Sequence, residues 1–235
     1  MQIVLSKTDE HWLSEAHPGV HLTDSGVAGE VKFTASYDSE SNLFSILDEG
    51  LPDDGSGMVL TCKFGIRIES RIETTFSALP ALFVEGTESL PDLHFGADKS
   101  ACLCSLLEED EFLLPEFQFK AFFERLVIPF LYYQAFHSIY GRWPWPEYAH
   151  FATGLLESYG KHPVPAKIPE LLRTLVKYRD AWIAIRAALM RPEYVKGHTQ
   201  CFCSEKDQIR RCHPSALRGV NLLREDIKAA KIVIP

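Results

Sequence analysis

The hydrophobic pattern of this 235-residue chain changes once, from a period of two to a helical period, near residue 115. The apolar residues that alternate with polar ones before this point are Val31, Phe33, Ala35 and Tyr37, and then Met58, Leu60, Cys62, Phe64, Ile66 and Ile68. Such alternation is typical of strands with one buried face, and the short Asp- and Gly-containing turns between the runs are typical of hairpins. The first half therefore predicts an antiparallel sheet, with Cys62 as a buried structural thiol.

Three helices are expected after residues 113–115, because apolar residues then recur three or four positions apart. The first includes the apolar stripe from Phe119 to Leu131, is bent or divided by Pro129, and ends at Gly141. The second is expected from Pro146 to Gly160 and the third from Pro169 to Leu189, with a linker over residues 161–166. The pattern as a whole is that of an α+β fold.

The composition favours one main hydrophobic core with a small additional module. The chain has a mass of 26.6 kDa, and 46% of its residues are hydrophobic. A net charge of -8 and a pI near 5.6 argue against a nucleic-acid partner, because proteins that bind phosphate backbones usually concentrate Lys and Arg. The first ten residues lack the apolar segment of a signal peptide, and no stretch approaches the roughly 18 apolar residues of a membrane span. We therefore expect a soluble, cytoplasmic protein with no nucleic-acid or membrane partner.

Four potential metal ligands lie within thirteen positions near the end of the chain: Cys201, Cys203, Cys212 and His213. Zinc favours a closed tetrahedron of thiolate and imidazole ligands, and four protein ligands leave no open position for catalysis. The sequence therefore predicts a structural zinc ion, with chance clustering of thiols as the alternative. The spacing resembles the SEC-C zinc motif, although residues 204–207 replace the Gly-Ser-Gly-Lys that commonly follows its second cysteine.

Cys102 lies between the two halves of the chain, after a loop of small and polar residues that includes Asp98. A nucleophilic cysteine needs partial exposure, a neighbour that favours the thiolate and a donor for the oxyanion. A loop that enters a helix can supply all three. The alternative is that Cys102 and Cys104 are small buried residues, as most structural cysteines are. Residue spacing alone leaves both interpretations open.

The order of elements resembles that of ubiquitin-conjugating enzymes: an antiparallel meander, a Pro-containing extended segment, a histidine, a Cys-Leu step and then helices. In that family a His-Pro-Asn motif precedes the active Cys-Leu. His94 matches the histidine, Cys102 the active cysteine and Leu103 its follower, whereas Phe95 and Gly96 replace proline and asparagine. The resemblance implies that Cys102 is the nucleophile and that His94 shapes the loop or orients the acyl carbonyl. Asp98 or a backbone amide is left to replace the asparagine.

The segment from Gly141 to Gly154 is similar to the Gly-x-Trp-Pro and His-x-x-x-Gly region of bacterial homologues of these enzymes. Some of those belong to CBASS antiphage operons that encode a cGAS/DncV-like nucleotidyltransferase. The resemblance implies a thioester between Cys102 and the carboxy-terminal glycine of that nucleotidyltransferase, which is then passed to an amine. A ubiquitin-activating-like protein is a further implied partner. Cys104 is open to three roles: acyl acceptor, disulfide partner of Cys102, or buried thiol.

Two other functions compete with this hypothesis. A catalytically silent interaction domain of the same fold would bind a carboxy-terminal tail or helix by shape. A cysteine protease or deconjugase would need a base hydrogen-bonded to Cys102, and no histidine-plus-acid motif identifies one. The expected domains are a catalytic domain over residues 1–165, a helical extension over 166–192, a zinc module over 193–214 and a C-terminal helix or tail over 215–235.

Overall fold

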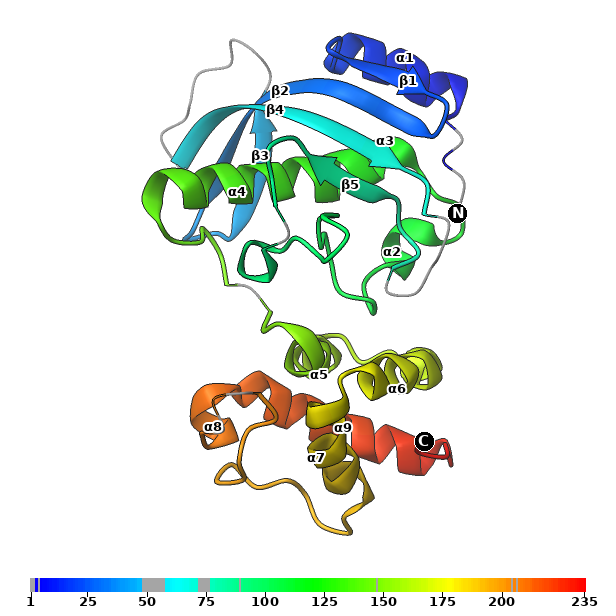
Figure 1. The fold of residues 1–235 in the computed structure, drawn as a ribbon, viewed down its shortest axis with the longest axis vertical. Coiled ribbons are helices and arrows are strands. Elements are labelled where there is room, and N and C mark those ends of the chain that lie inside the picture. The colour runs from blue at the N-terminus through cyan, green and yellow to red at the C-terminus, as the bar shows by residue number, and fades with distance from the viewer. Residues whose placement is uncertain are drawn as a thin grey trace. The chain divides into compact units, whose positions relative to one another are not determined.

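A computed structural model describes residues 3, 5–47, 58–71, 77–88, 90–146, 148–203, 205 and 207–235. It contains an antiparallel sheet followed by helices (Figure 1), which confirms the predicted α+β class. The chain divides into two compact units, and each has its own hydrophobic core. The sheet unit comprises residues 1–104 and 109–147, and the helical unit comprises residues 105–108 and 148–235. Among the described residues, no helix has the length and apolar character that a membrane crossing requires.

The sheet of the first unit has the strand order β1-β2-β4-β5, with β3 also paired to β2. Every pairing is antiparallel. The long strand β2 pairs with β4 along one edge, while β1 and β3 occupy opposite ends of its other edge. The strands are β1 (Val20–Thr23), β2 (Gly26–Asp38), β3 (Leu43–Leu47), β4 (Met58–Glu69) and β5 (Ala81–Val84).

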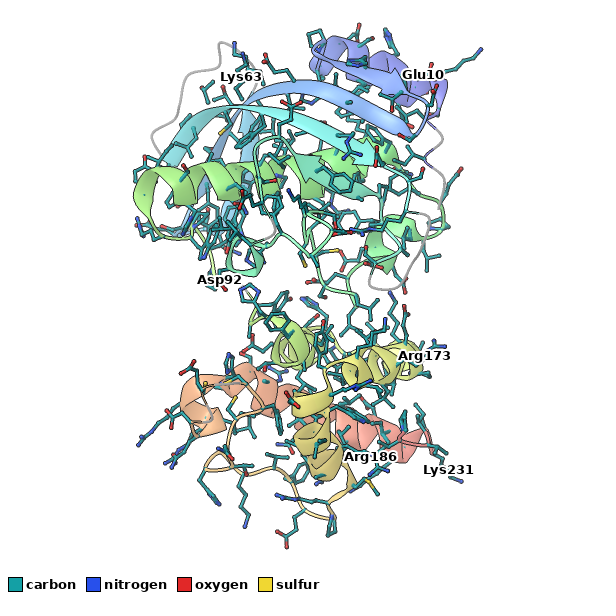
Figure 2. The ribbon with its side chains drawn as sticks, viewed as in Figure 1. Glu10, Lys63, Asp92, Arg173, Arg186 and Lys231 are labelled. Carbon is teal, nitrogen blue, oxygen red and sulfur yellow. The ribbon has the colours of Figure 1, made fainter. Side chains whose placement is uncertain are left out.

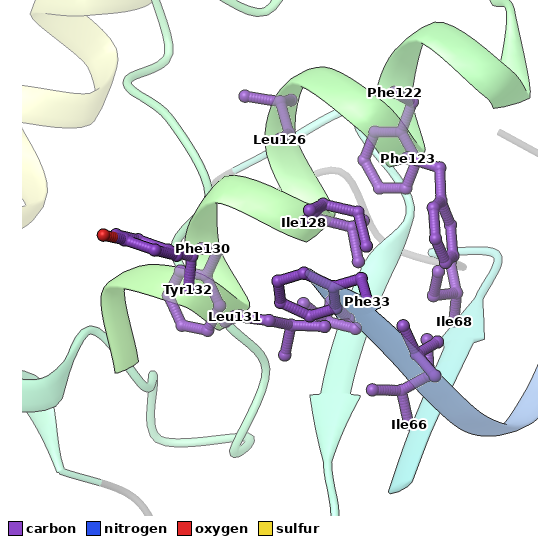
Figure 3. Close-up of a cluster of buried hydrophobic side chains, with 14 of the residues drawn as sticks. Phe33, Ile66, Ile68, Phe122, Phe123, Leu126, Ile128, Phe130, Leu131 and Tyr132 are labelled. Atoms are coloured by element: carbon purple, nitrogen blue, oxygen red, sulfur yellow. The ribbon is translucent and has the colours of Figure 1, made fainter. Parts of the chain in front are cut away.

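The alternation in β4 has the predicted effect, because Leu60, Cys62, Ile66 and Ile68 are buried while their polar neighbours face solvent. Figure 3 shows Ile66 and Ile68 in the cluster that joins the sheet to the first long helix. That helix begins with α3 (Phe119–Phe122), continues through a π-helical turn (Phe123–Val127) and ends with α4 (Ile128–Tyr140).

The π-helical turn lies immediately before Pro129, where the sequence predicts a bend or division. Proline has no N–H to donate, and its ring clashes with the preceding turn of a regular helix. A wider turn removes this conflict and lets the buried stripe continue into α4. Gly141 then ends α4 in the left-handed conformation, as predicted. The side chain of Tyr132 in α4 donates a 2.6 Å hydrogen bond to the carbonyl oxygen of Met58 and so ties the helix to β4.

Three short elements complete the sheet unit. Helix α1 (Lys7–Ala16) precedes β1, a 3₁₀ turn spans Pro91–Leu93, and α2 (Asp110–Leu113) precedes α3. His17, which follows α1, is buried against the rings of Trp12 and Phe123 at centroid distances of 5.4 and 4.8 Å. Burial lowers the pKa of this imidazole, because the protonated form loses its hydration.

The helical unit contains α5 (Phe151–Lys161), α6 (Ile168–Lys177), α7 (Arg179–Met190), α8 (Ile209–Cys212) and α9 (Pro214–Ala229), with a 3₁₀ turn over Pro165–Lys167. Helix α5 begins five residues after the predicted start at Pro146, so that prediction is wrong. The buried Glu157 side chain accepts a 2.8 Å hydrogen bond from the backbone N–H of Ala149, and His150 is extended. These contacts hold the preceding residues out of the helix.

The single helix predicted from Pro169 to Leu189 is also wrong, because the chain breaks at Tyr178 and forms α6 and α7. An unbroken helix of this length would extend roughly 30 Å. The break instead lets Leu171 and Leu175 of α6 and Ile185 of α7 bury their side chains in the same core. Local periodicity does not distinguish one long amphipathic helix from two short ones on the same core.

The division between the units differs from the predicted boundary at residue 165. Helix α5 packs closely against α9, where Gly160 meets Gly219, and the Tyr159 hydroxyl donates a 2.5 Å hydrogen bond to Asp226. The core of this unit also includes residues of α6, α7 and the cysteine-rich segment. The helical extension, zinc module and C-terminal helix that were expected as separate parts therefore belong to one unit with α5.

Candidate functional sites

The segment from His94 to Cys102 forms a small hairpin at the end of the sheet. Phe95 and Ala101 form an antiparallel bridge, and the N–H of Cys102 donates a 2.8 Å hydrogen bond to the carbonyl oxygen of His94. The N–H of Ala101 donates to the carbonyl oxygen of Leu82 in β5, also at 2.8 Å. The structure thus brings the backbones of the two predicted catalytic residues, His94 and Cys102, directly opposite each other.

The tip of this hairpin is held by Asp98. Its Oδ1 accepts hydrogen bonds from the N–H and hydroxyl of Ser100 at 3.0 and 2.7 Å. The Arg71 guanidinium lies 3.5 Å from Asp98 Oδ2 and donates a 3.1 Å hydrogen bond to the Ser100 hydroxyl. Partial burial opposes ionisation of Asp98, but the Ser100 hydrogen bonds and the charge of Arg71 outweigh it and lower the pKa.

These contacts favour a structural role for Asp98. An ionised carboxylate only accepts hydrogen bonds, so it cannot donate one to an oxyanion as the family asparagine would. The predicted auxiliary residue therefore stabilises the hairpin that carries Cys102. Arg71 and Ser100 were not predicted as part of this site, because nothing in their local sequence links residue 71 to residues 98–100.

Cys102 is exposed, whereas Ala101 before it is buried and Leu103 after it is half-buried. Its Sγ lies 4.0 Å from the carbonyl oxygen of Cys104. Cys104 is half-buried and packs against the core of the sheet unit. This environment fits the buried-thiol interpretation of Cys104 and leaves Cys102 as the accessible thiol of the pair.

His94 has a positive φ of 60°, a conformation that is costly for residues with a side chain. Its ring lies edge-on to Tyr133 and Trp143, with both centroid distances 5.8 Å. Trp143 in turn stacks on Tyr133 at 4.2 Å and on His137 at 3.9 Å. The aromatic cluster holds the His94 ring, which supports a role in shaping the loop. Trp143 and His137 act here as packing residues.

A groove of about 640 Å³ lies elsewhere on the sheet unit. Its apolar lining comes from Tyr37, Phe44 and Ile46 on the sheet side and from Trp145 after α4. Glu124 and Arg125 of the π-helical turn also line it. Ile46 is 41% exposed, so the groove presents apolar surface to solvent. The lining comes from three separate segments, so no single stretch of the sequence predicts the groove.

The four cysteine and histidine residues predicted as metal ligands gather in the helical unit. One ligand atom from each of Cys201, Cys203, Cys212 and His213 can be chosen so that all lie within 4.8 Å of one another. The Sγ of Cys201 is 3.2 Å from Nδ1 of His213, and the Sγ atoms of Cys203 and Cys212 are 3.4 Å apart. Ligands at about 2.1 to 2.3 Å from a zinc ion are roughly 3.5 Å apart in a tetrahedron. The cluster can therefore hold a metal ion.

The backbone brings the two halves of the cluster together. Gln200 and Gln208 form an antiparallel bridge, and the N–H of Cys201 donates to the carbonyl oxygen of Asp207 at 2.7 Å. Helix α8 then carries Cys212. Burial and the neighbouring thiols of Cys203 and Cys201 raise the pKa of Cys212 to about 12. A bound cation would stabilise the thiolate and so lower this pKa. Ser204 and Lys206, where the sequence departs from the SEC-C pattern, lie outside the described residues.

Comparisons with protein-family models, curated proteins and solved structures found no match to this chain. The two sites are therefore defined by their own geometry: a Cys102 hairpin in the sheet unit and a Cys₃His cluster in the helical unit.

Proposed function

We propose that the protein is an acyl transferase of ubiquitin-conjugating type that forms a thioester through Cys102. The observation that carries this proposal is the exposed thiol of Cys102 on a hairpin whose backbone is bonded to both His94 and β5. A rigid, accessible thiol can take an acyl group from one protein and present it to another without a closed small-molecule pocket. The order of sheet, histidine, cysteine and helices supports the same class.

The proposed reaction has two steps. The Cys102 thiolate attacks the acyl carbon of a carboxy-terminus held as a thioester on a ubiquitin-activating-like partner, and the cysteine of that partner leaves as a thiolate. An amine then attacks the Cys102 thioester, which forms an amide and releases the Cys102 thiolate while the amine loses a proton to water. Through its aromatic contacts, His94 fixes the loop in which both steps occur.

The proposed acyl donor is the carboxy-terminus of a cGAS/DncV-like nucleotidyltransferase in CBASS antiphage defence. This part of the proposal rests on the resemblance of residues 94–103 and 141–154. We further propose a cytoplasmic location, where thiols stay reduced, and zinc as the ion held by Cys201, Cys203, Cys212 and His213. With four protein ligands, this zinc would crosslink Cys201 and Cys203, which precede α8, to Cys212 at the end of α8 and His213 after it, and would take no part in the transfer.

The test is co-expression with the nucleotidyltransferase and the ubiquitin-activating-like partner, followed by non-reducing gels and intact mass measurement. We expect wild type and Cys62→Ala to form a covalent species that thiol reagents release, and Cys102→Ala to form none. Cys104→Ala should retain the adduct, because the Cys104 side chain packs against the core. An adduct that persists in Cys102→Ala, or no adduct in a wild type that still binds the nucleotidyltransferase, would refute transfer through Cys102.

The groove lined by Phe44 and Trp145 favours one alternative, a non-catalytic domain that binds a tail or helix. In that case wild type and Cys102→Ala would bind the nucleotidyltransferase equally without an adduct, and Trp145→Ala would weaken binding. Transfer through Cys102 predicts instead that the Cys102→Ala variant loses the covalent product while its binding stays intact.

A further inference from the structure

The whole-chain charge conceals a strong division between the two units. By sequence, the sheet unit has nine Lys and Arg against 23 Asp and Glu, a net charge of -14. The helical unit has fifteen Lys and Arg against nine Asp and Glu, a net charge of +6. The net charge of -8 for the whole chain therefore does not exclude a nucleic-acid partner for the helical unit. Charge asymmetry of this kind points to a polyanionic partner for the basic part.

Part of this positive charge is gathered beside the Cys₃His cluster. Lys196, Arg210 and Arg211 are all exposed. The N–H of Arg210 donates a 3.1 Å hydrogen bond to the carbonyl oxygen of Gly197, and its side chain lies so close to Gly197 that a Cβ there would be 2.9 Å from the Arg210 Cβ. The loop that carries Lys196 and the helix that carries the two arginines thus lie side by side.

An exposed aromatic ring adjoins these charges. Tyr194 is 58% exposed, whereas the next residue, Val195, is buried. The side chain of Asn221 bonds both backbone groups of Val195, at 2.8 and 3.1 Å, and so fixes this segment. With Val195 turned inward, Tyr194 and Lys196 both face solvent. We call Tyr194, Lys196, Arg210 and Arg211 the knuckle surface.

A buried cation supports the Tyr194 ring. The guanidinium carbon of Arg224 lies 4.4 Å from the ring centroid, and the Arg224 side chain is only 3% exposed. Its Nη2 donates to Glu225, while Nε and Nη1 are buried without a hydrogen-bond partner among the described residues. The ring is therefore held in place next to a positive charge that is only partly compensated.

We propose that the knuckle surface binds single-stranded nucleic acid. Exposed aromatic rings stack on unpaired bases, and adjacent Lys and Arg contact the phosphates, which is how sequence-tolerant single-strand sites are built. A paired duplex hides its base faces, so it would use the charges but not Tyr194. An acidic protein surface would likewise contact the Lys and Arg side chains but would offer no bases to stack on the Tyr194 ring. This proposal is independent of the transfer reaction at Cys102.

The test is fluorescence anisotropy of the full-length protein with labelled oligo-U RNA, oligo-dT DNA and a DNA duplex, each of about 20 nucleotides or base pairs. Titrations at several salt concentrations between about 50 and 200 mM measure how many phosphates are contacted. The RNA and DNA arms distinguish the two sources of single strands. Sedimentation of the protein alone, at the same salt concentrations, detects self-association in which the basic unit of one molecule binds the acidic unit of another.

The variants separate a local site from diffuse charge. Lys196→Ala/Arg211→Ala removes two charges from the knuckle surface, whereas Arg173→Ala/Lys231→Ala removes the same two residue types elsewhere on this unit (Figure 2). We expect the first pair to reduce the slope of log affinity against log salt by about 1.4, and the second to change it little. Tyr194→Ala should weaken single-strand binding by at least roughly fivefold, and Tyr194→Phe should retain it.

Four results would overturn the proposal. The first is that the wild type does not bind single strands at low salt, and the second is that both charge-pair variants reduce the salt slope equally. The third is that Tyr194→Ala binds with wild-type affinity, and the fourth is that the duplex binds more tightly than either single strand. Salt-sensitive self-association without nucleic-acid binding would assign the basic surface to the acidic unit of a second copy instead. The zinc content of each variant is measured as a control. It distinguishes a direct loss of nucleic-acid binding from a loss that follows release of the metal.

Discussion

The contact between Gly160 and Gly219 should be the most sensitive point of the helical unit. A Cβ on Gly219 would overlap the carbonyl oxygen of Leu156 in α5 and lie 2.6 Å from its carbonyl carbon. A Cβ on Gly160 would lie 2.9 Å from the Ser215 carbonyl oxygen and 3.0 Å from the Gly219 nitrogen. Backbone atoms cannot rotate away as side chains do. Gly219→Ala must therefore push α5 and α9 apart by roughly 1.5 to 2 Å to restore ordinary contact.

Two opposing terms set the magnitude. Alanine is favoured over glycine by about 1 kcal/mol inside a helix. Overpacking in a well-packed core costs about 1 to 3 kcal/mol, and the separation also removes contacts between the two helices. We expect a net destabilisation of about 2 kcal/mol, which increases opening of the helical unit roughly 30-fold. Gly160→Ala should act in the same direction but less strongly, because its Cβ distances are longer.

Hydrogen-exchange mass spectrometry measures this opening directly in peptides from α5 and α9. Ala184→Gly is the matched control, because Ala184 is exposed within α7 and reports the intrinsic glycine penalty of about 1 kcal/mol in the same unit. Peptides from β2 and β4 should exchange as in wild type. If Gly219→Ala slows exchange in α5 and α9, helix propensity outweighs the clash and the close helix crossing is refuted.

Three further predictions concern single residues. Iodoacetamide should label Cys102 at least about 100-fold faster than Cys62 at neutral pH, because burial raises the pKa of Cys62 to about 11; comparable rates measured by peptide mass would contradict the assigned burial. Since the folded-state pKa of His17 is lowered, stability is retained above about pH 6.5 and falls as the pH drops below it. Urea titrations at about pH 7.5 and about pH 5.5 should show this loss, and His17→Phe should reduce it. Cys203→Ser should lower the bound zinc measured by elemental analysis, whereas Cys62→Ser should leave about one zinc per chain.

The sheet could be predicted because its signal is local. Each strand alternates over its own residues, and a hairpin needs only a short turn between neighbours. The Cys₃His cluster could be predicted for a similar reason, since its ligands lie within thirteen positions and need one hairpin and α8 to meet. In both cases the residues that determine the structure are close together in the sequence.

The features that sequence reasoning missed depend on polar contacts, some of them local, and on partners far along the chain. Helix α5 begins late because Glu157 reaches back to Ala149, and no periodicity records that hydrogen bond. The hairpin that carries Cys102 depends on Arg71 and Tyr133, which lie far from it in the sequence. Cys102 itself was identified from its neighbours, but its supporting residues could be found only once the sheet and α4 were placed.

The segment that follows Cys104 is bonded to α5 and to the turn before α6. Residues 105–108, which follow Cys104 at once, belong to that unit rather than to the sheet unit. The Ser105 hydroxyl is 2.5 Å from that of Ser158 in α5, and Lys167 donates a 2.9 Å hydrogen bond to the Leu106 carbonyl oxygen. The side chain of Leu107 is buried in the helical core. Opening of α5 and α9 would therefore release the chain three residues after Cys102. The exchange rate of residues 105–108 in Gly219→Ala should therefore rise together with that of α5.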